Sequence, residues 1–403
     1  MTEKALKNIR VLDATHVWAG PITGLLLADM GAEVIHVERP EEGDRQRSPL
    51  IHGPGLLGEN LVFLFLNRNK KSITLNLGAK KGQEIFKVLV QKSDVVVENF
   101  VPGTTERLGL GYDALSKLNP RIIMVSISGF GQYGPDRERR AFDPAIQAIS
   151  GLTSVTGFPD RPPVRSGAVI ADFLGGIFGF CGAMIALYWR EQSGEGQWVD
   201  ASLMDSTIFT LGDRIVRYAA LGEPELIARL GNAYPFLPLD TFYSTKDGYF
   251  YSIGFGEAVV IKLAEMIGAS ECIRIDEAAE TGMDLGWALL GQIDRPLREL
   301  LKGKTNDEAK VIFEEAGLDF YPVLTLDKVM EHPQFKARDM LVEVEHPKLG
   351  KLKIPGIVPK LSKTPGSVES AGPSLGQHNE EIYCGLLGYT REELAKLEEE
   401  KII

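Results

Sequence analysis

Apolar and polar residues alternate in blocks along the first 130 residues, a pattern typical of strands that alternate with helices. Residues 9–13 (IRVLD) and 32–38 (AEVIHVE) are short apolar runs that predict buried strands. The stretch between them has Pro21 near its start and Gly31 at its end, which is typical of a helix. Three further elements follow, a helix at 78–94 and strands at 94–100 and 121–130. This order predicts an α/β fold with an open parallel sheet, and ligands are expected at the carboxyl ends of its strands.

The pattern changes after about residue 225. Residues 239–255 (LDTFYSTKDGYFYSIGF) place aromatic and β-branched residues on both sides of Asp247 and Gly248, which predicts a β-hairpin. Further elements are expected in this half of the chain, namely helices near 256–267 and 306–316, an extended Pro- and Gly-rich return connection from about 323, and a short helix at 390–402.

One carboxylate stands alone in an apolar, glycine-rich segment. Asp172 lies within residues 166–180 (SGAVIADFLGGIFGF), and the next charged residue is Arg190. A buried carboxylate needs compensation, so either Asp172 caps the helix expected at 173–189 or it acts chemically in a pocket. This helix approaches membrane-spanning length, but it holds four glycines and has no counterpart elsewhere in the sequence, so a buried helix is predicted.

Bulk properties narrow the classes of function. A chain of 403 residues predicts two domains, and a net charge of −11 argues against nucleic acid or an anionic membrane as the main partner. The three cysteines are far apart and the amino terminus lacks the apolar stretch of a signal peptide, so a cytoplasmic location is expected. None of the six histidines pairs at metal-ligand spacing, and we expect no metal site.

Common cofactor and hydrolase motifs are missing from the expected places. The loop after the first strand reads THVWAGP, without the glycine pattern of dinucleotide-binding folds, and the sequence contains no Gly-x-Ser-x-Gly. Arginines instead follow several predicted strands, among them Arg39, Arg107 and Arg140. Each alone is typical of a solvated surface charge, but their convergence at one edge of the sheet would suit a phosphorylated ligand.

Beyond these patterns, nine segments of the chain closely resemble the class III CoA-transferase family, which includes formyl-CoA and carnitine-type CoA-transferases. In chain order they read VLDATHVWAGPITGLLLADMGAEVIHVERP, NRNKKSITLNL, VVVENFVPGTTERLGLGY, SISGFGQYGP, SGAVIADFLGG, GEGQWVDASL, HPQFKARDM, PGIVPKLSKTPG and LGQHNEEIYCGLLG. The resemblance covers nearly the whole chain and is weakest across 220–320.

The resemblance implies a fold and an assembly. A large Rossmann-like domain with a parallel sheet would be built from both chain ends, with a smaller α+β domain inserted between them. The implied borders give residues 1–220 to the first part of the large domain, 226–322 to the small domain, and 323–403 to a return linker with the rest of the large domain. Two such chains would form an interlocked homodimer.

The resemblance also implies site residues and a reaction. Asp172 matches the catalytic aspartate of the family, and a position at a helix start would help to keep it ionised through the helix dipole. The positions that match CoA-binding residues are Val17, Trp18, Ala19, Arg39, Leu75, Asn99, Phe100, Arg107 and Arg140. The implied substrates are an acyl-CoA and a free carboxylic acid, exchanged through an aspartyl mixed anhydride and an aspartyl-CoA thioester.

Two alternatives remain at this point. Related 2-methylacyl-CoA racemases carry Gly-His-Asp where this chain has Ala141, Phe142 and Asp143, and Phe142 cannot transfer a proton. Glu257 could match a racemase acid, or it could be a solvated residue at a helix start. A CoA-thioester-binding protein without transferase activity is the other alternative. The run of consecutive glycines that formyl-CoA transferases carry in the small domain is missing, which argues against formyl or oxalyl specificity. Trp18 either shapes the acyl pocket or only packs.

Overall fold

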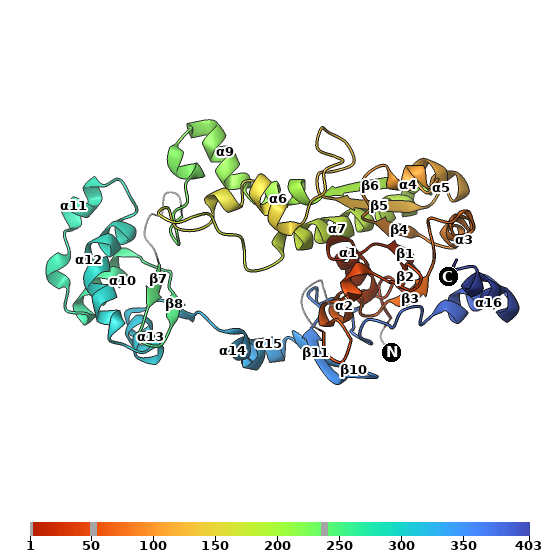
Figure 1. Ribbon diagram of the computed structural model, residues 1–403. Coiled ribbons are helices and arrows are strands. Elements are labelled where there is room, and N and C mark those ends of the chain that lie inside the picture. The colour runs from red at the N-terminus through yellow and green to blue at the C-terminus, as the bar shows by residue number, and fades with distance from the viewer. Residues whose placement is uncertain (1–2, 49–54, 235–240) are drawn as a thin grey trace. The chain divides into compact units, whose positions relative to one another are not determined.

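The computed structural model describes residues 3–48, 55–234 and 241–403, which form two compact units. One unit comprises Met1–Leu152, Arg165–Gly212 and Pro333–Ile403, and the other comprises Thr153–Val164 and Asp213–His332. The larger unit therefore contains both chain ends. Figure 1 shows the helices and strands of each unit.

A six-stranded sheet forms the centre of the larger unit, with the strand order β3-β2-β1-β4-β5-β6 and every pairing parallel. The strands are β1 (Arg10–Ala14), β2 (Glu33–Glu38), β3 (Lys71–Thr74), β4 (Val95–Glu98), β5 (Ile123–Ser128) and β6 (Trp198–Ser202). The predicted α/β fold with a parallel sheet is confirmed. The sequence patterns did not indicate the two edge strands, β3 and β6.

Helices cover both faces of this sheet because its buried strands are apolar on both sides. Alternate residues, such as Val11 and Leu12, belong to separate apolar clusters. One cluster includes α1 (Ala19–Asp29) and α7 (Ile170–Ser193), and the other includes α3 (Lys80–Gln91) and α5 (Tyr112–Leu118). Shorter helices of this unit are α2 (Leu61–Leu66), α4 (Thr104–Arg107), α6 (Asp143–Ile149), α8 (Leu203–Phe209) and α15 (Pro333–Ala337).

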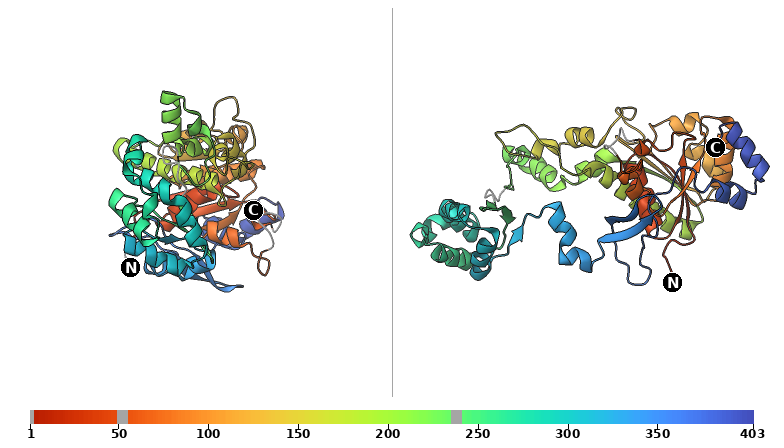
Figure 2. Two further views of the ribbon diagram at one scale, coloured as in Figure 1. Left: turned by 90° about the vertical axis from the view of Figure 1, so that its left-hand side faces the viewer. Right: turned by 60° about the horizontal axis from the view of Figure 1, so that its bottom comes forward.

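The carboxy-terminal segment packs beside the amino-terminal strands (Figure 2). The Ser72 backbone N–H donates to His378 Nδ1 at 3.0 Å, and the His378 N–H donates to the Ser72 carbonyl at 2.9 Å. Farther along, the Asn76 N–H donates to the Ile402 carbonyl at 2.8 Å. The helical turn Glu380–Leu386 and α16 (Arg391–Glu399) bury Ile382, Tyr383 and Leu397 against the same face as α3.

The predicted extended return connection is only partly extended. Residues 341–355 form an antiparallel ribbon of β10 (Leu341–His346) and β11 (Gly350–Pro355), which packs through Val344 and Ile354 against α2. The earlier part of this stretch is helical, in α14 (Leu326–Glu331) and α15. Alternating apolar residues in 341–355 fit the ribbon, although the density of Pro and Gly masked that pattern.

Helix α7 is buried along one face only, which corrects the prediction of a buried helix. Its small residues approach α1, and the Thr23 hydroxyl donates to the Gly176 carbonyl at 2.8 Å. The opposite face exposes large apolar side chains, namely Ile177, Phe178, Ile185, Tyr188 and Trp189. Among the described residues, α7 is the one helix with the length and hydropathy of a membrane span, a property that core helices share.

The smaller unit has an α+β composition. Its sheet pairs β7 (Phe242–Ser244), β8 (Tyr249–Tyr251) and β9 (Tyr321–Pro322), with all pairings antiparallel. The β7–β8 pairing confirms the predicted hairpin, although its first two residues, 239–240, lie outside the described residues. Its helices are α9 (Gly212–Leu221), α10 (Glu257–Met266), α11 (Ile275–Glu280), α12 (Leu285–Lys302), α13 (Asn306–Ala316) and α14.

Candidate active site

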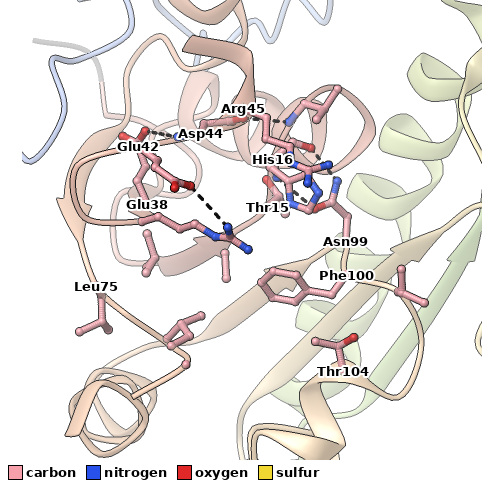
Figure 3. Close-up of a pocket in the computed structure, with 18 of the residues that line it drawn as sticks. Thr15, His16, Glu38, Glu42, Asp44, Arg45, Leu75, Asn99, Phe100 and Thr104 are labelled. Atoms are coloured by element: carbon pink, nitrogen blue, oxygen red, sulfur yellow. Dashed lines mark hydrogen bonds and ion pairs between the residues drawn. The ribbon is translucent and has the colours of Figure 1, made fainter. Parts of the chain in front are cut away.

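A cavity of about 1080 Å³ opens at the carboxyl ends of the parallel strands. Its walls come from the loops that follow β1 to β5, together with residues 139–142 and Lys401. Figure 3 shows His16 beside Asn99, with Asp44 and Arg45 on the adjoining loop and Leu75, Phe100 and Thr104 around the remaining wall. This is the edge at which the sequence patterns placed a ligand, and we call it the strand-end pocket.

The strand-end pocket brings together most of the predicted CoA-binding residues. Six of them line it, namely Val17, Arg39, Leu75, Asn99, Phe100 and Arg140. Trp18, Ala19 and Arg107 do not belong to its lining. Arg107 is an exposed residue at the end of α4, and it donates to the hydroxyl of Thr104, a lining residue, at 2.8 Å.

Several basic side chains of this pocket already have carboxylate partners. Arg47 forms two hydrogen bonds to Glu38, at 2.6 and 2.7 Å, and Lys401 lies 2.9 Å from Glu41. Arg39 forms a more open pair, 3.5 Å from Glu42, and its side chain is largely exposed. The sequence patterns missed Arg45, which also lines the pocket. Asp44, which caps the helical turn that carries Arg45, is a signal that could have located it.

The loop after β1 is fixed by polar contacts from two neighbouring loops. Val17 has a φ of 72°, a conformation that β-branched residues rarely adopt. Its N–H donates to Asp44 Oδ1 at 3.2 Å. The Asn99 side chain accepts from the His16 N–H at 3.0 Å and donates to the His16 carbonyl at 2.7 Å. The shape of this wall therefore depends on Asp44 and Asn99.

Asp172 lies in the first turn of α7, and it does not cap the helix. The helix begins at Ile170, and the Asp143 carboxylate from α6 accepts the N–H groups of Ala171 at 2.6 Å and Asp172 at 3.4 Å. Gln147 holds Asp143 in place, donating to its Oδ2 at 2.6 Å. The capping interpretation of Asp172 is therefore wrong, because Asp143 supplies the cap.

The electrostatic surroundings of Asp172 also differ from the prediction. Burial and the negative charge of Asp143 raise the pKa of Asp172 to about 7. The sequence instead predicts that the helix dipole helps to keep this carboxylate ionised. The difference has a physical cause, because the N–H groups that carry the positive end of the dipole donate to Asp143. Within the described part of the chain, no group donates a hydrogen bond to the Asp172 carboxylate.

Asp172 is not part of the lining of the strand-end pocket, but one aromatic contact joins the segment that carries it to the loop that carries Val17. The rings of Trp18 and Phe173, the neighbours of Val17 and Asp172, lie 5.9 Å apart. Phe142 is two-thirds exposed and lines the pocket, at the position where racemases carry histidine. Glu257 begins α10 in the other compact unit and stays an untested prediction.

Comparisons with known proteins agree with the resemblance in the sequence. The family model described as CoA-transferase family III matches residues 6–379. Two similar proteins come from Chloroflexus aurantiacus. A succinyl-CoA–D-citramalate CoA-transferase is 39% identical, over 99% of this chain and 98% of its own length. The beta subunit of a succinyl-CoA–L-malate CoA-transferase is 36% identical, over 100% and 99%. A crystal structure of a CAIB/BAIF family protein from Brucella suis has a TM-score of 0.83 and 31% identity, and the match covers 95% of this chain and 100% of that one.

Proposed function

Because this chain belongs to CoA-transferase family III, we propose that it moves CoA between two carboxylic acids through covalent intermediates on Asp172. Membership in this family shows that the protein is an enzyme that acts on CoA thioesters and transfers CoA between acids. The identity of the nucleophile, the CoA-contacting residues and the assembly are our proposals, and the local structure supports them as follows.

The transfer requires four balanced steps. A carboxylate oxygen of Asp172 attacks the acyl carbon of the donor thioester, the C–S bond breaks, and CoA thiolate leaves a mixed anhydride. The thiolate then attacks Cγ of Asp172, which releases the donor acid and forms an aspartyl-CoA thioester. The acceptor carboxylate attacks Cγ and displaces the thiolate, which finally attacks the acceptor acyl carbon. The new acyl-CoA leaves, Asp172 is a carboxylate again, and no proton is gained or lost.

The observation that carries this proposal is the unpartnered state of the Asp172 carboxylate. A carboxylate that accepts several hydrogen bonds is stabilised and is a weaker nucleophile. Asp143 accepts the N–H groups at the start of α7, so they do not stabilise Asp172. A raised pKa of about 7 is compatible with an ionised fraction at neutral pH and with a reactive carboxylate. A residue needed only for binding CoA would not require this arrangement.

The strand-end pocket supports binding of the nucleotide part of CoA. Its volume of about 1080 Å³ suits a large ligand, and exposed arginines stand at and beside its walls. Arg39, Arg107 and Arg140 are proposed to contact the phosphates. The remaining predicted residues, Val17, Trp18, Ala19, Leu75, Asn99 and Phe100, are proposed to shape the path from the nucleotide to Asp172.

The substrates are proposed by analogy with the relatives. Two of them are named for succinyl-CoA as donor and for hydroxydicarboxylic acids as acceptors. Succinyl-CoA with citramalate or malate is therefore the first pair to assay. We also propose that the enzyme is an interlocked homodimer, because the exposed apolar face of α7 would be costly to leave in water. A cytoplasmic location is a separate part of this proposal.

Trapping tests the covalent mechanism. The enzyme is incubated with succinyl-CoA alone and then with hydroxylamine, and its peptides are analysed by mass spectrometry. Aspartyl hydroxamate is expected at Asp172, and Asp172→Asn should lose both the adduct and transfer while still binding CoA. Asp205→Asn is the matched control, because Asp205 is an exposed acid in the first turn of α8. Transfer that survives in Asp172→Asn refutes the mechanism, and exchange of the α-proton with deuterated water but no acyl transfer would indicate a racemase.

A further inference from the structure

A cluster of charged side chains lies in and behind one wall of the strand-end pocket. Asp13 and His36 are fully buried on β1 and β2, and Asp44 is 4% exposed on the loop after β2. Lys70 donates to Asp13 Oδ2 at 2.7 Å, from the segment that precedes β3. Buried charges are stable only when they are paired, so the charges of this cluster must balance.

Counting the charges leaves one carboxylate without a permanent cation. Lys70 balances Asp13, and Arg47 balances Glu38 through its two hydrogen bonds. The third buried carboxylate, Asp44, faces the ring of His36, with Nε2 3.6 Å from Asp44 Oδ2. The cluster is neutral only if His36 carries a positive charge.

The orientation of the imidazole ring leads to the same conclusion. Nδ1 lies 3.2 Å from the Asp13 carbonyl oxygen and 3.5 Å from its Oδ2, so one nitrogen faces oxygens of Asp13 and the other faces Asp44. A neutral histidine carries a lone pair on one nitrogen, and either tautomer would direct that lone pair at an oxygen. Among the described residues, neither Nε2 nor Asp44 Oδ2 has a hydrogen-bond partner, so each is the nearest opposite charge for the other, at 3.6 Å.

We propose that His36 is a buried imidazolium cation that acts as a positioning residue for the CoA site, by holding Asp44 and through it the Val17 loop. Asp44 Oδ1 accepts from Val17 and also from the Gln46 N–H at 2.8 Å, so one carboxylate joins two walls of the pocket. Without the His36 charge, the unpaired Asp44 would move toward water or take up a proton. The consequence for ligand binding rests on the proposed function, since it requires that this pocket holds CoA.

The groups around the ring support a cation at neutral pH. Asp13 on β1, Glu38 on β2 and Asp44 on the following loop are negative, while Lys70, which donates to the same Asp13 Oδ2, is a positive neighbour. His16 on the loop after β1 is also close, but burial lowers its pKa and favours its neutral form. Burial lowers the pKa of His36, but the three carboxylates outweigh it and raise the pKa to about 9. A raised folded-state pKa means that the contribution is complete below about pH 6.5 and is lost as the pH rises through about 9.

Nitrogen NMR on protein labelled at its histidines tests the charge directly, without any CoA. The His36 signal, assigned by its loss in His36→Gln, should show both ring nitrogens protonated at pH 7, with a midpoint near 9. The wild-type spectrum alone decides this point if the variant fails to fold, because the other five histidines can be assigned by single substitution. A neutral His36 at pH 7 overturns the proposal.

Binding measurements test the positioning role. His36→Gln should raise the Kd for CoA and the KM for acyl-CoA roughly tenfold, the ratio produced by about 1.4 kcal/mol, with kcat changed much less. Asp44→Asn keeps an acceptor oxygen for Val17. The double variant His36→Gln/Asp44→Asn removes both charges, so its loss of CoA binding should be smaller than the losses of the two single variants combined. His346→Gln is the control, because His346 is a buried histidine on the β10–β11 ribbon and contacts none of these residues.

The outcomes separate the two proposals. If the wild-type enzyme does not bind CoA, the proposed function fails, but a protonated His36 would still support the charge assignment. If the wild type binds CoA and His36→Gln binds it equally well, the positioning role is wrong. An equal effect of His346→Gln would also overturn it, because the loss would then follow from removing any buried histidine.

Discussion

Under the proposed mechanism, the pH dependence of transfer should follow from the surroundings of Asp172. Only the ionised carboxylate can attack a thioester, and the pKa of Asp172 is raised to about 7 by burial and by Asp143. About half of the carboxylate is then ionised at pH 7, about a tenth at pH 6 and about a hundredth at pH 5. With an ordinary pKa of 3.8, more than about nine-tenths would be ionised at pH 5. The two cases differ by roughly a hundredfold in rate at pH 5.

The assay is kcat/KM for succinyl-CoA between pH 5 and 8.5, which reports ionisations of the free enzyme. A tenfold fall per pH unit below 7 is expected. Asp143→Asn removes the neighbouring charge but keeps an acceptor for the Ala171 N–H, so the fall should begin at lower pH. The pKa of Asp172 in this variant should still lie above the ordinary range of an aspartate, because burial is the larger cause of its shift. A flat profile to pH 5 in the wild type would refute the reasoning.

The raised pKa of Asp172 also changes how the stability of the folded protein depends on pH. The folded-state pKa of Asp172 lies above its unfolded value, so the folded protein is favoured at low pH and loses stability as the pH rises from about 4 to 7. A shift of three units corresponds to at most about 4 kcal/mol. Asp172→Asn should therefore raise the melting temperature at pH 8. A helix-capping residue would behave in the opposite way, and a lower melting temperature would contradict our account.

Three further predictions concern other parts of the larger unit. Replacing Arg39, Arg107 or Arg140 with Ala should raise KM for acyl-CoA by the ratio that a loss of about 1.5–3 kcal/mol per charged contact produces, and an unchanged KM in all three removes them from the site. Gly176→Ala should lower the free energy of unfolding by about 1–3 kcal/mol, measured in urea, because its Cβ would lie 2.7 Å from the Ala19 carbonyl oxygen; full stability would show that α1 can shift. Ile185→Asp should convert the proposed dimer to monomer in light scattering, and a stable dimer would mean that this side chain stays outside the interface.

The strands that the sequence predicted are the ones buried on both faces. β1, β2, β4 and β5 have neighbours on both sides in the sheet, and most of their residues are apolar, with buried polar exceptions such as Asp13 and His36. β3 (KSIT) and β6 (WVDAS) are edge strands whose polar residues hydrogen-bond to other segments, and no apolar run marks them. Local patterns therefore identify the centre of the sheet better than its edges.

The candidate site was predictable only in part. Arginines that follow strands could be assigned to one edge, because parallel strands end together. The contact of Asp143 with the start of α7 joins residues 29 positions apart, and no local sequence pattern predicts it. The same holds for the pairing of His36 with Asp44, which depends on how a loop folds back over β2. The domain borders at 220–226 and 322–323 stay predictions, which limited proteolysis can examine.

The attachment of the last residues to β3 has a consequence for how the protein is made. Ser72, Thr74 and Asn76 find hydrogen-bond partners in His378, Asn379 and Ile402, more than 300 residues later. While the chain is still being synthesised, this edge of the sheet and the apolar residues around α3 stay uncovered. Larger chains in that state are prone to aggregate, so the nascent enzyme should depend on chaperones until residues 378–402 have left the ribosome. A chain that lacks residues 378–402 would leave these groups of β3 without those partners and the apolar residues around α3 uncovered, and we expect such a chain to be retained by chaperones or degraded.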